Sequence, residues 1–581
     1  MASIDSLRHL LDAGLIRPSD PSAEDDYAFE HALLQEAAYT SLLRTERRDL
    51  HRAVGDSLEA AYPERQDELA PRLAEHFLQG GDSIRALSYL RRAGHAAERL
   101  YASAESSMHF ARAFDLLDPD STASADLEDV VTGLGRALEL QSRFADAVRV
   151  YEWLEGAARG RGEPALELTA MMARAKVLAT PNPTKDPDLA ASTLERALEL
   201  ARHTGNVAAE SRVLWNQMIL RVYGGGDIHE AVALGQASLE LARQEGLDEQ
   251  RAFTLNDLVY AYTALDDPSS ALAAQAEAEA LWRRLGNQPM LADCLAISVV
   301  NRHMTGAFGP ARSAAEEASA IARRIDNLWG RANSRFFIVH VYLDEGRPDL
   351  AIEASEETIW WGRLAGHDVA AYISSADLAW IHAYLGDLEG ALGELQAVAA
   401  TPAPFPENLL RPHVLGHLGR VQVRLGDLEA AHRSFAEAEA ILPGEGLRLM
   451  APFLLPMGEV ELALAEGDSE RAGQRIRAYL RYLKEHGARA FVPEALMLSA
   501  EVHRRHGREA DARGELEQAY EAARAMGLIR ILGPLARALA LIAKEPAPDW
   551  PARAQEALGI VASHIPDETR RQQFLRSSRG D

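Results

Sequence analysis

Apolar and small residues recur along this chain at helical spacing, in segments separated by short polar turns. In the stretch ALGELQAV, Leu395 lies four residues after Ala391 and three after Leu392, and Val398 lies three after Leu395. This spacing places their side chains on one face of a helix, so it predicts an amphipathic helix that packs through that face. The same pattern returns throughout the chain, which predicts an all-α protein.

The predicted helices are organised by a repeat of about 40 residues. A turn that precedes a helix begins at Gly226, Asp266, Gly306, Gly346, Gly386, Gly426, Gly467 and Gly507, in steps of 40 residues with one step of 41. An alanine follows each turn five residues later, at Ala231, Ala271, Ala311, Ala351, Ala391, Ala431, Ala472 and Ala512. Less regular copies lie near Gly81, Ala102, Ser142 and Lys185, which gives about twelve units.

The pattern predicts that each unit is a hairpin of two helices. Glycine tolerates the positive φ that ends the first helix, and Asp or Ser in the turn can accept hydrogen bonds from the open N–H groups of the second. A small residue one turn into the second helix lets the two backbones approach closely. One hairpin cannot cover both of its apolar faces, so we expect the hairpins to stack as a solenoid.

The units resemble tetratricopeptide repeats, with Gly419, Gly426 and Ala431 at the small-residue and turn positions of that family. The resemblance implies a TPR-like helical-hairpin solenoid wound as a right-handed superhelix. A period of about 40 residues exceeds the 34 of the family consensus and implies longer helices. In this respect the repeats are more similar to those of bacterial signalling ATPases of the STAND class than to short chaperone-adaptor repeats.

Both ends of the chain carry further resemblances. Residues 27–55 resemble the segment that joins the winged-helix region of bacterial AAA/STAND ATPase regulators to their repeats. Those regulators include transcriptional regulators and class III adenylate cyclases. The matching residues are Phe29, His31, Gln35, Glu36, Tyr39, Leu43, Arg47, Leu50 and His51. The motifs LAEHF and AGHAAERLYASAES extend the likeness, and IPDETRRQQFL resembles the closing helix of such arrays, so we expect a complete array.

These resemblances imply three regions: residues 1–70 as winged-helix-end and junction helices, 71–545 as the repeat array, and 546–581 as a C-terminal capping helix. The ATPase module that precedes the junction in those proteins has no counterpart in this sequence. We therefore expect half of a split system, a start codon shifted downstream, or a fragment.

Charge and cysteine content narrow the classes of partner. The formal charge of −26 disfavours DNA or RNA, because sequence-independent nucleic-acid binding needs a basic surface. The single cysteine, Cys294, excludes an internal disulfide and a multi-thiolate zinc site. The first residues lack a signal-peptide pattern, and no later segment is apolar over 18 residues. We expect a cytoplasmic protein with no membrane partner.

No chemical motif stands out. The chain has no G-x-x-x-x-G-K-[ST] sequence, and we interpret Gly224, Gly225 and Gly226 as a repeat turn rather than a phosphate cradle. His31 and His51 are expected to bridge helices, and Cys294 to lie in the core. We found no His pair with a carboxylate at a known metal-binding spacing among the 19 histidines. The sequence therefore predicts no catalytic residues, no cofactor and no metal site.

A protein-binding groove is the remaining candidate, since one side of the first helices should line the concave face of such a solenoid. Counting back from the repeat alanines places fourteen residues there: Asn216, Tyr223, Asn256, Tyr260, His303, Asn333, Phe336, His340, Trp380, Tyr384, Arg420, Arg424, Arg504 and Arg505. Aromatic and Arg side chains suit protein recognition, and Asn can bond to an extended backbone. The alternative is that Phe336, Trp380 and Tyr384 fill the packing between repeats.

Two functions follow from this sequence. The leading hypothesis is a non-catalytic interaction scaffold that serves as the sensor or regulatory region of a STAND-type system, with residues 1–70 contacting an ATPase or cyclase module on the same or another chain. The alternative is a freestanding adaptor that binds a peptide in its groove without an ATPase partner. A small effector inside the superhelix is compatible with either.

Overall fold

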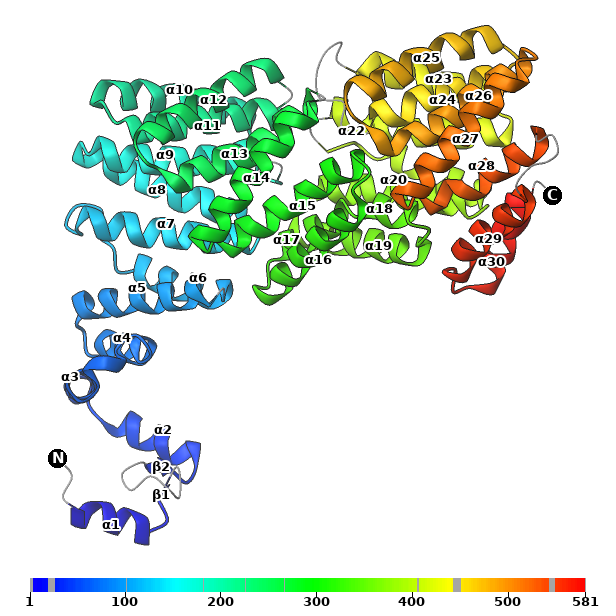
Figure 1. Cartoon of the computed structure of the whole chain (residues 1–581). Coiled ribbons are helices and arrows are strands. Elements are labelled where there is room, and N and C mark those ends of the chain that lie inside the picture. Colours follow the sequence, from blue (N-terminus) through cyan, green and yellow to red (C-terminus); the bar gives the residue numbers. More distant parts are fainter. Residues whose placement is uncertain are drawn as a thin grey trace. The chain divides into compact units, whose positions relative to one another are not determined.

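The computed structural model describes residues 4–18, 27–100, 102–180, 182–224, 226–265, 267–404, 407–442, 451–542 and 549–579. It divides into two compact units, residues 1–134 and 135–581, each described here by itself. Helices form nearly all of the regular structure (Figure 1), which confirms the all-α prediction. Within the described ranges no helix is both long and apolar enough to cross a bilayer.

The first unit combines a small strand pair with helices. Helix α1 (Ile4–Asp12) precedes two antiparallel strands, β1 (Ile16–Pro18) and β2 (Tyr27–Phe29), which the sequence did not predict. The elements that follow are α2 (Ala32–Ser41), α3 (Arg44–Ala61), the 3-10 turn η1 (Pro63–Arg65), α4 (Ala70–Gln79), α5 (Ser83–Arg99) and α6 (Ser103–Phe114). Leu73, Phe77 and Leu90 form the centre of its core. Helix α7 (Ser124–Leu140) continues into the second unit.

The second unit is a series of helical hairpins. Its first part contains α8 (Phe144–Arg161), α9 (Pro164–Ala179), α10 (Pro187–Thr204), α11 (Val207–Gly224), α12 (Ile228–Gln244), α13 (Asp248–Ala264), α14 (Pro268–Leu285), α15 (Gln288–Met304) and α16 (Phe308–Arg324). The next first helix is divided into α17 (Leu328–Phe336) and α18 (Val339–Asp344). It is followed by α19 (Pro348–Ala365), α20 (Asp368–Tyr384) and α21 (Leu388–Ala400).

The remaining hairpins complete the array. They are α22 (Glu407–Leu425), α23 (Leu428–Ile441), α24 (Ala451–Ala465), α25 (Ser469–Glu485), the 3-10 turn η2 (Arg489–Phe491), α26 (Val492–Arg505), α27 (Glu509–Met526), α28 (Ile529–Ile542), α29 (Trp550–Ser563) and α30 (Glu568–Arg579). Where the sequence predicted one capping helix after residue 545, the structure has two, and α29 is paired with α28. The domain boundaries at residues 70 and 545 remain predictions.

The repeat turns have the local structure that their residues predict. Positive φ is adopted by Gly306, Gly346, Gly386, Gly426, Gly467 and Gly507, with values from 71° to 98°. The side chains of Asp227, Asp267, Asp387, Asp427 and Asp468 accept hydrogen bonds from the N–H groups that open the second helices. All eight repeat alanines are at most 1% exposed. Gly226 is an exception without positive φ, and Asp266 lies outside the described residues.

The first helices of the hairpins lie on the inner side of the solenoid. Successive first helices pack against one another, as α9 does with α11, α11 with α13, α13 with α15 and α15 with α17. Over the described part of the chain, second helices such as α10, α12 and α14 have no comparable contact with each other. The first helices are therefore closer together and form the face that we call the first-helix face.

The solenoid of the second unit turns back on itself near its end. A Cβ added at Gly306 would lie 2.5 Å from Sδ of Met526, and one at Gly346 would lie 2.9 Å from Cγ2 of Ile529. Nε2 of Gln573 donates to the carbonyl oxygen of Gly386 at 3.1 Å. Residues of the turns after α15, α18 and α20 therefore pack against α27, α28 and α30. The repeat pattern did not predict this contact.

Candidate functional site

The fourteen predicted groove residues differ in exposure. Six are buried: Asn216, Asn256, His303, Asn333, Trp380 and Arg420. Five are half-buried: Tyr223, Tyr260, Phe336, His340 and Tyr384. Three are exposed: Arg424, Arg504 and Arg505. The six buried side chains contact residues of neighbouring repeats. A partner can therefore reach only the half-buried and exposed residues.

The buried asparagines join successive first helices. Nδ2 of Asn256 donates to Oδ2 of Asp293 at 2.8 Å, and Nδ2 of Asn333 donates to Oδ1 of the same carboxylate at 2.9 Å. Nδ2 of Asn216 donates to the carbonyl oxygen of Met172 at 3.3 Å. These amides hold the first-helix face together, and the two that bond to Asp293 also fix the orientation of its carboxylate.

Asp257 and Asp293 are the functional candidates that the sequence analysis missed. Both are half-buried on the first-helix face and form no ion pair within the described ranges, although the ammonium group of Lys176 lies close enough to lower the pKa of Asp257. Nε1 of Trp215 donates to Oδ2 of Asp257 at 2.7 Å. The rings of Tyr223 and Tyr260 lie beside these carboxylates, with their centroids 5.7 Å apart. We call Tyr223, Asp257, Tyr260 and Asp293 the acidic patch.

Burial makes the ionised forms of the acidic patch costly. Burial raises the pKa of Asp257 to about 7, and the carboxylate of Asp293 adds to this rise. Burial also raises the pKa of Asp293 to about 6. The pKa of each tyrosine is raised well above its usual value, again chiefly by burial. A cationic group placed against these carboxylates would stabilise their charged forms.

The predicted arginines further along the array are mostly engaged with acids of the chain itself. Arg420 donates to both carboxylate oxygens of Glu461, at 3.0 and 2.6 Å, and to Glu494 at 2.8 Å. Arg530 joins Glu494, at 2.9 Å, to Asp344, at 2.7 Å. These four contacts link α18, α22, α24, α26 and α28. They contribute to the closure of the solenoid rather than to an open groove.

Trp380, Arg504 and Arg505 also contact neighbouring side chains. The guanidinium groups of Arg420 and Arg424 each lie 4.6 Å from the ring centroid of Trp380. This buried tryptophan therefore fills the packing between repeats, which is the alternative raised from the sequence. Arg504 and Arg505 both form ion pairs with Glu501 on their own helix.

Three histidines gather around one carboxylate in a second cluster that the sequence analysis did not identify. Nε2 of His413 lies 2.7 Å from Oδ1 of Asp377, and Nε2 of His417 lies 3.2 Å from the same oxygen. Nε2 of His340 lies 3.4 Å from that oxygen. The separation of His413 and His417 by four residues was a signal for two imidazoles on one helix face.

A second signal was also present in the sequence. Side chains that bond across first helices are about one repeat apart: Trp215 and Asp257 by 42 residues, Asn256 and Asp293 by 37, and His413 and Asp377 by 36. Polar residues at equivalent positions of successive repeats are therefore candidate neighbours.

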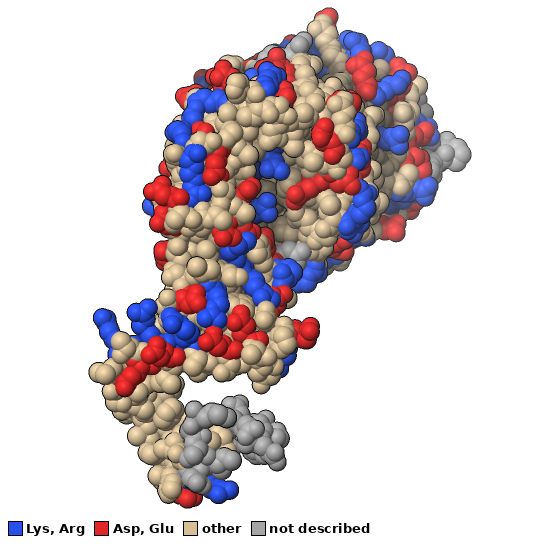
Figure 2. Space-filling model, turned by 90° about the vertical axis from the view of Figure 1, so that its left-hand side faces the viewer, with Lys and Arg blue, Asp and Glu red and all other residues tan. Residues whose placement is uncertain are grey.

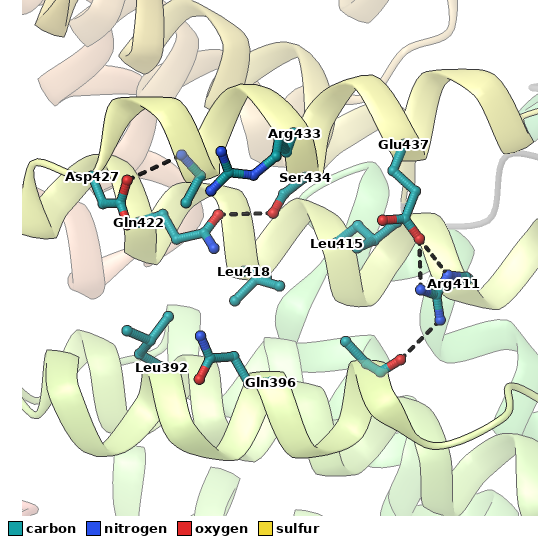
Figure 3. Close-up of a pocket in the computed structure, with 12 residues that line it drawn as sticks. Leu392, Gln396, Arg411, Leu415, Leu418, Gln422, Asp427, Arg433, Ser434 and Glu437 are labelled. Atoms are coloured by element: carbon teal, nitrogen blue, oxygen red, sulfur yellow. Dashed lines mark hydrogen bonds and ion pairs between the residues drawn. The ribbon is translucent and has the colours of Figure 1, made fainter.

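A cavity of about 410 Å³ lies between α21, α22 and α23 (Figure 3). Helix α21 has 13 residues whereas α19 has 18, and Pro402 and Pro404 follow its end. The shortened helix leaves space beside α23, lined by Leu392, Gln396 and Leu418 among others. The polar groups around it are engaged, as Ser434 donates to Gln422 at 2.8 Å and Arg411 donates to Glu437 at 2.8 Å.

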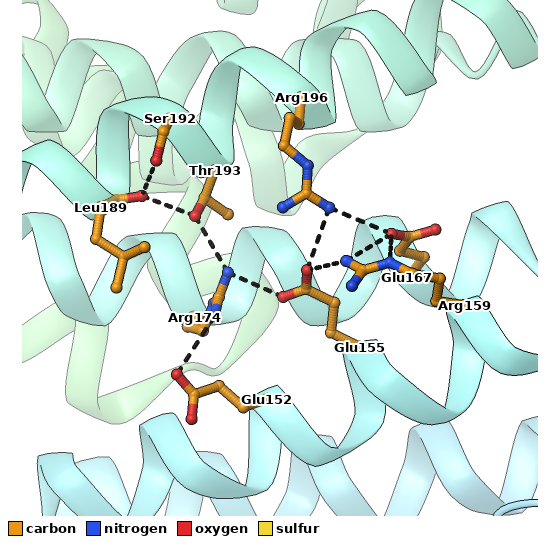
Figure 4. Close-up of polar contacts among 9 residues, drawn as sticks. All are labelled: Glu152, Glu155, Arg159, Glu167, Arg174, Leu189, Ser192, Thr193 and Arg196. Carbon is orange, nitrogen blue, oxygen red and sulfur yellow. Dashed lines mark hydrogen bonds and ion pairs between the residues drawn. The ribbon is translucent and has the colours of Figure 1, made fainter.

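An ionic cluster joins α8, α9 and α10 (Figure 4), with Glu155 and Arg174 buried at its centre and Arg159 and Arg196 exposed at its rim. The side chain of Glu155 is 7% exposed and forms ion pairs with Arg159, Arg174 and Arg196. Glu167 contacts two of the same arginines. The positive and negative charges neutralise each other within the cluster, so it stabilises the hairpins and offers no vacant charge to a ligand.

Over the face drawn in Figure 2, Lys and Arg intermingle with Asp and Glu, and the upper, larger part of that face is hollowed. The mixture of signs argues against an extended polyanion site on this face. Cys294 is buried, as predicted, and burial raises the pKa of its thiol well above the usual range.

No known family profile matches the chain, and no curated protein matches its sequence. Solved structures of similar fold include the APC/C hetero-tetramer Cut9–Hcn1, with 14% identity, a TM-score of 0.39 and coverage of 85% of this chain and 96% of that one. A Rap protein complexed with competence and sporulation factor has 14% identity, a TM-score of 0.42, and coverage of 61% and 97%.

A third similar structure is a STAND signal transduction ATPase with a tetratricopeptide repeat sensor from Pyrococcus horikoshii. Its identity is 13%, its TM-score is 0.42, and the match covers 75% of this chain and 58% of that one. This chain thus spans less than two thirds of the length of that ATPase. Likeness of this degree identifies no ligand or partner.

Proposed function

We propose that this protein is a non-catalytic interaction scaffold whose first-helix face binds a polypeptide through a Lys or Arg side chain. The observation that carries the proposal is the acidic patch, in which two carboxylates lie half-buried on the first-helix face with no ion pair among the described residues, since the nearby Lys176 is paired with Glu139. Buried charges in proteins are normally paired. A partner's cation would supply the missing charge.

The surroundings of the carboxylates suit a basic side chain. Asn256 and Asn333 fix the carboxylate of Asp293, so it does not need to reorganise on binding. The rings of Tyr223 and Tyr260 provide faces on which an ammonium or guanidinium group can rest. A polypeptide partner thus fits this site better than an anionic ligand such as a nucleotide.

The first unit supports a second contact, with an ATPase or cyclase module. Apolar side chains of the junction segment are exposed there: Leu33 is 78% exposed, Leu43 66% and Leu50 52%. A contiguous exposed apolar patch marks a surface that another protein covers, and we infer that these three leucines contribute to such a patch. We therefore favour a sensor or regulatory role in a STAND-type system.

A freestanding adaptor is the alternative, and it requires only the acidic patch. The two roles are distinguished by the junction, because an adaptor does not need its exposed leucines for function. In the STAND-type role, Leu33→Gln with Leu43→Gln abolishes binding of the ATPase module while peptide binding at the acidic patch persists. An adaptor shows no such module contact to lose.

Peptide selection tests the central proposal. Random peptides displayed on phage are selected on the immobilised full chain, and the affinity of a recovered peptide is measured by fluorescence anisotropy. We expect enrichment of Lys or Arg, and a loss of about tenfold or more in affinity for Asp257→Asn with Asp293→Asn, since a charged hydrogen bond contributes about 1.5–3 kcal/mol.

The matched control is Glu195→Gln with Glu199→Gln on α10, which removes the same charge from an exposed second helix. Equal losses for both double variants would show that only the net charge matters. Selected peptides without basic residues would also contradict the proposal.

A further inference from the structure

The cluster of Asp377, His340, His413 and His417 lies on the inner helices, apart from the acidic patch, and it joins three successive repeats. His340 is on α18, Asp377 on α20, and His413 and His417 on α22. Asp377, His413 and His417 are at most 1% exposed, and the side chain of His340 is 20% exposed. The potential ligand atoms of the three buried residues all lie within 4.8 Å of one another.

The contacts converge on one atom. Three imidazole Nε2 atoms lie at 2.7, 3.2 and 3.4 Å from Oδ1 of Asp377. A carboxylate oxygen offers about two lone-pair sites, so it cannot accept three well-directed hydrogen bonds from N–H groups. Hydrogen bonding alone therefore leaves at least one of the three Nε2 atoms without a proper partner.

A metal ion bound between Oδ1 of Asp377 and the three Nε2 atoms would give each of these four atoms a partner. Imidazole nitrogen and carboxylate oxygen bind Zn²⁺ at about 2.0–2.1 Å, so neighbouring ligand atoms of a tetrahedral site are about 3.3 Å apart. Two of the three distances to Oδ1, from His417 at 3.2 Å and His340 at 3.4 Å, lie near this value, and Nε2 of His413, at 2.7 Å, would move away from Oδ1 by about 0.6 Å when a metal binds. Each Nε2 would then contribute a lone pair rather than compete to donate a proton to the same oxygen.

We propose that Asp377, His413 and His417, with His340 as the fourth ligand, form a binding site for a divalent transition metal of the Zn²⁺ class. Three imidazoles and one carboxylate are a ligand set that Zn²⁺ accepts, and soft thiolate ligands are absent from it. The protein supplies all four positions, which is typical of structural rather than catalytic zinc. The metal would fasten α18, α20 and α22 to one another.

Metal content of the full chain is the direct test. The protein is purified without a metal-affinity step, dialysed against micromolar ZnCl₂ and then against metal-free buffer, and its zinc is measured by mass spectrometry. We expect one Zn²⁺ per chain, and titration of the chelator-treated protein with CoCl₂ should give the visible absorption of tetrahedral Co²⁺. No retained zinc together with no such absorption in the unaltered chain overturns the proposal.

Two double variants distinguish this site from adventitious binding. His413→Gln with His417→Gln should lose the bound zinc, and it should also lose the rise in thermal unfolding midpoint that ZnCl₂ causes in the unaltered chain. His382→Gln with His432→Gln is the control, since each of these imidazoles pairs with a single glutamate elsewhere on the surface.

The control variant should keep one Zn²⁺ per chain. Loss in the control but retention in the first variant refutes the assignment. If the first variant fails to fold by circular dichroism, the cobalt spectrum of the unaltered chain decides the question by itself.

Discussion

Replacing Asp257 by Asn should stabilise this protein while it weakens the binding of a partner. Burial raises the pKa of Asp257 to about 7 from an ordinary value of 3.8. A rise of about three pKa units corresponds to about 4 kcal/mol of cost for the charged carboxylate in the folded state. Because the side chain is only half-buried, solvent screens part of this cost, and we expect a gain of about 2 kcal/mol at pH 8.

The pH dependence of this gain follows from the direction of the shift. In the unfolded chain the carboxyl group ionises near pH 3.8, whereas in the folded chain it stays protonated until about pH 7. The stability of the unaltered protein therefore falls as the pH rises from about 4 to about 7, and the Asn variant lacks this loss. The advantage of the variant should be small at pH 4 and largest at pH 8. Asn retains an oxygen that can accept from Trp215.

Thermal and urea unfolding followed by circular dichroism at pH 4, 6 and 8 measure this difference. Glu199→Gln on the exposed surface of α10 is the control, and its effect should stay within about 0.5 kcal/mol at each pH. A destabilised Asp257→Asn variant at pH 8, or a gain in stability that does not change with pH, would show that the ionised carboxylate of Asp257 does not destabilise the folded protein. Destabilisation at pH 8 would mean that a cationic group of the protein already compensates the negative charge of Asp257.

Three further outcomes are expected. His367 stacks on Trp329, and burial lowers the pKa of its imidazole to about 4. The free energy of unfolding should therefore fall by up to about 3 kcal/mol as the pH drops from about 6.5 to 4. Thermal melts of His367→Gln should lack this fall. Glu155→Gln removes the closer carboxylate partner of the buried Arg174 and should cost about 3 kcal/mol in urea unfolding, and no change would contradict the role of that cluster. Gly346→Ala should destabilise the protein more than Gly426→Ala in the same assay. Both glycines have positive φ, but only at Gly346 would the added Cβ lie within 4 Å of another side chain. Equal losses of stability would argue against the contact of the turns with α28.

The fold was predictable because its signals are local. Gly386, Asp387 and Ala391 determine a helix end, a cap and a close helix contact within six residues, and the same trio returns around Gly426 and Gly467. The small residue at the alanine position returns in all eight units. Stacking then follows, since each hairpin needs a neighbour to cover its apolar faces. The two short strands and the division between α17 and α18 had no comparable signal.

The sites were less predictable because they depend on which residues of different repeats meet. Asn256 and Trp380 were assigned to a groove surface, yet they are buried between first helices, since a shift of one helical position turns a side chain by about 100°. Asp257, one residue after Asn256, is the group that remains half-exposed. The packing of α28 against α18 joins Arg530 to Asp344 across 186 residues, a distance that the 40-residue period cannot indicate.

Locating a bound peptide by cross-linking tests directly whether the first-helix face binds a basic side chain at the acidic patch. A basic peptide recovered by selection is synthesised with a photoreactive residue next to its Lys or Arg, irradiated with the full chain, and the linked residues are identified by mass spectrometry. We expect links to the first helices α11, α13 and α15 around Tyr223 and Tyr260, and their loss in Asp257→Asn with Asp293→Asn. Links to the second helices α10, α12 or α14, or links that persist in that variant, would contradict this expectation.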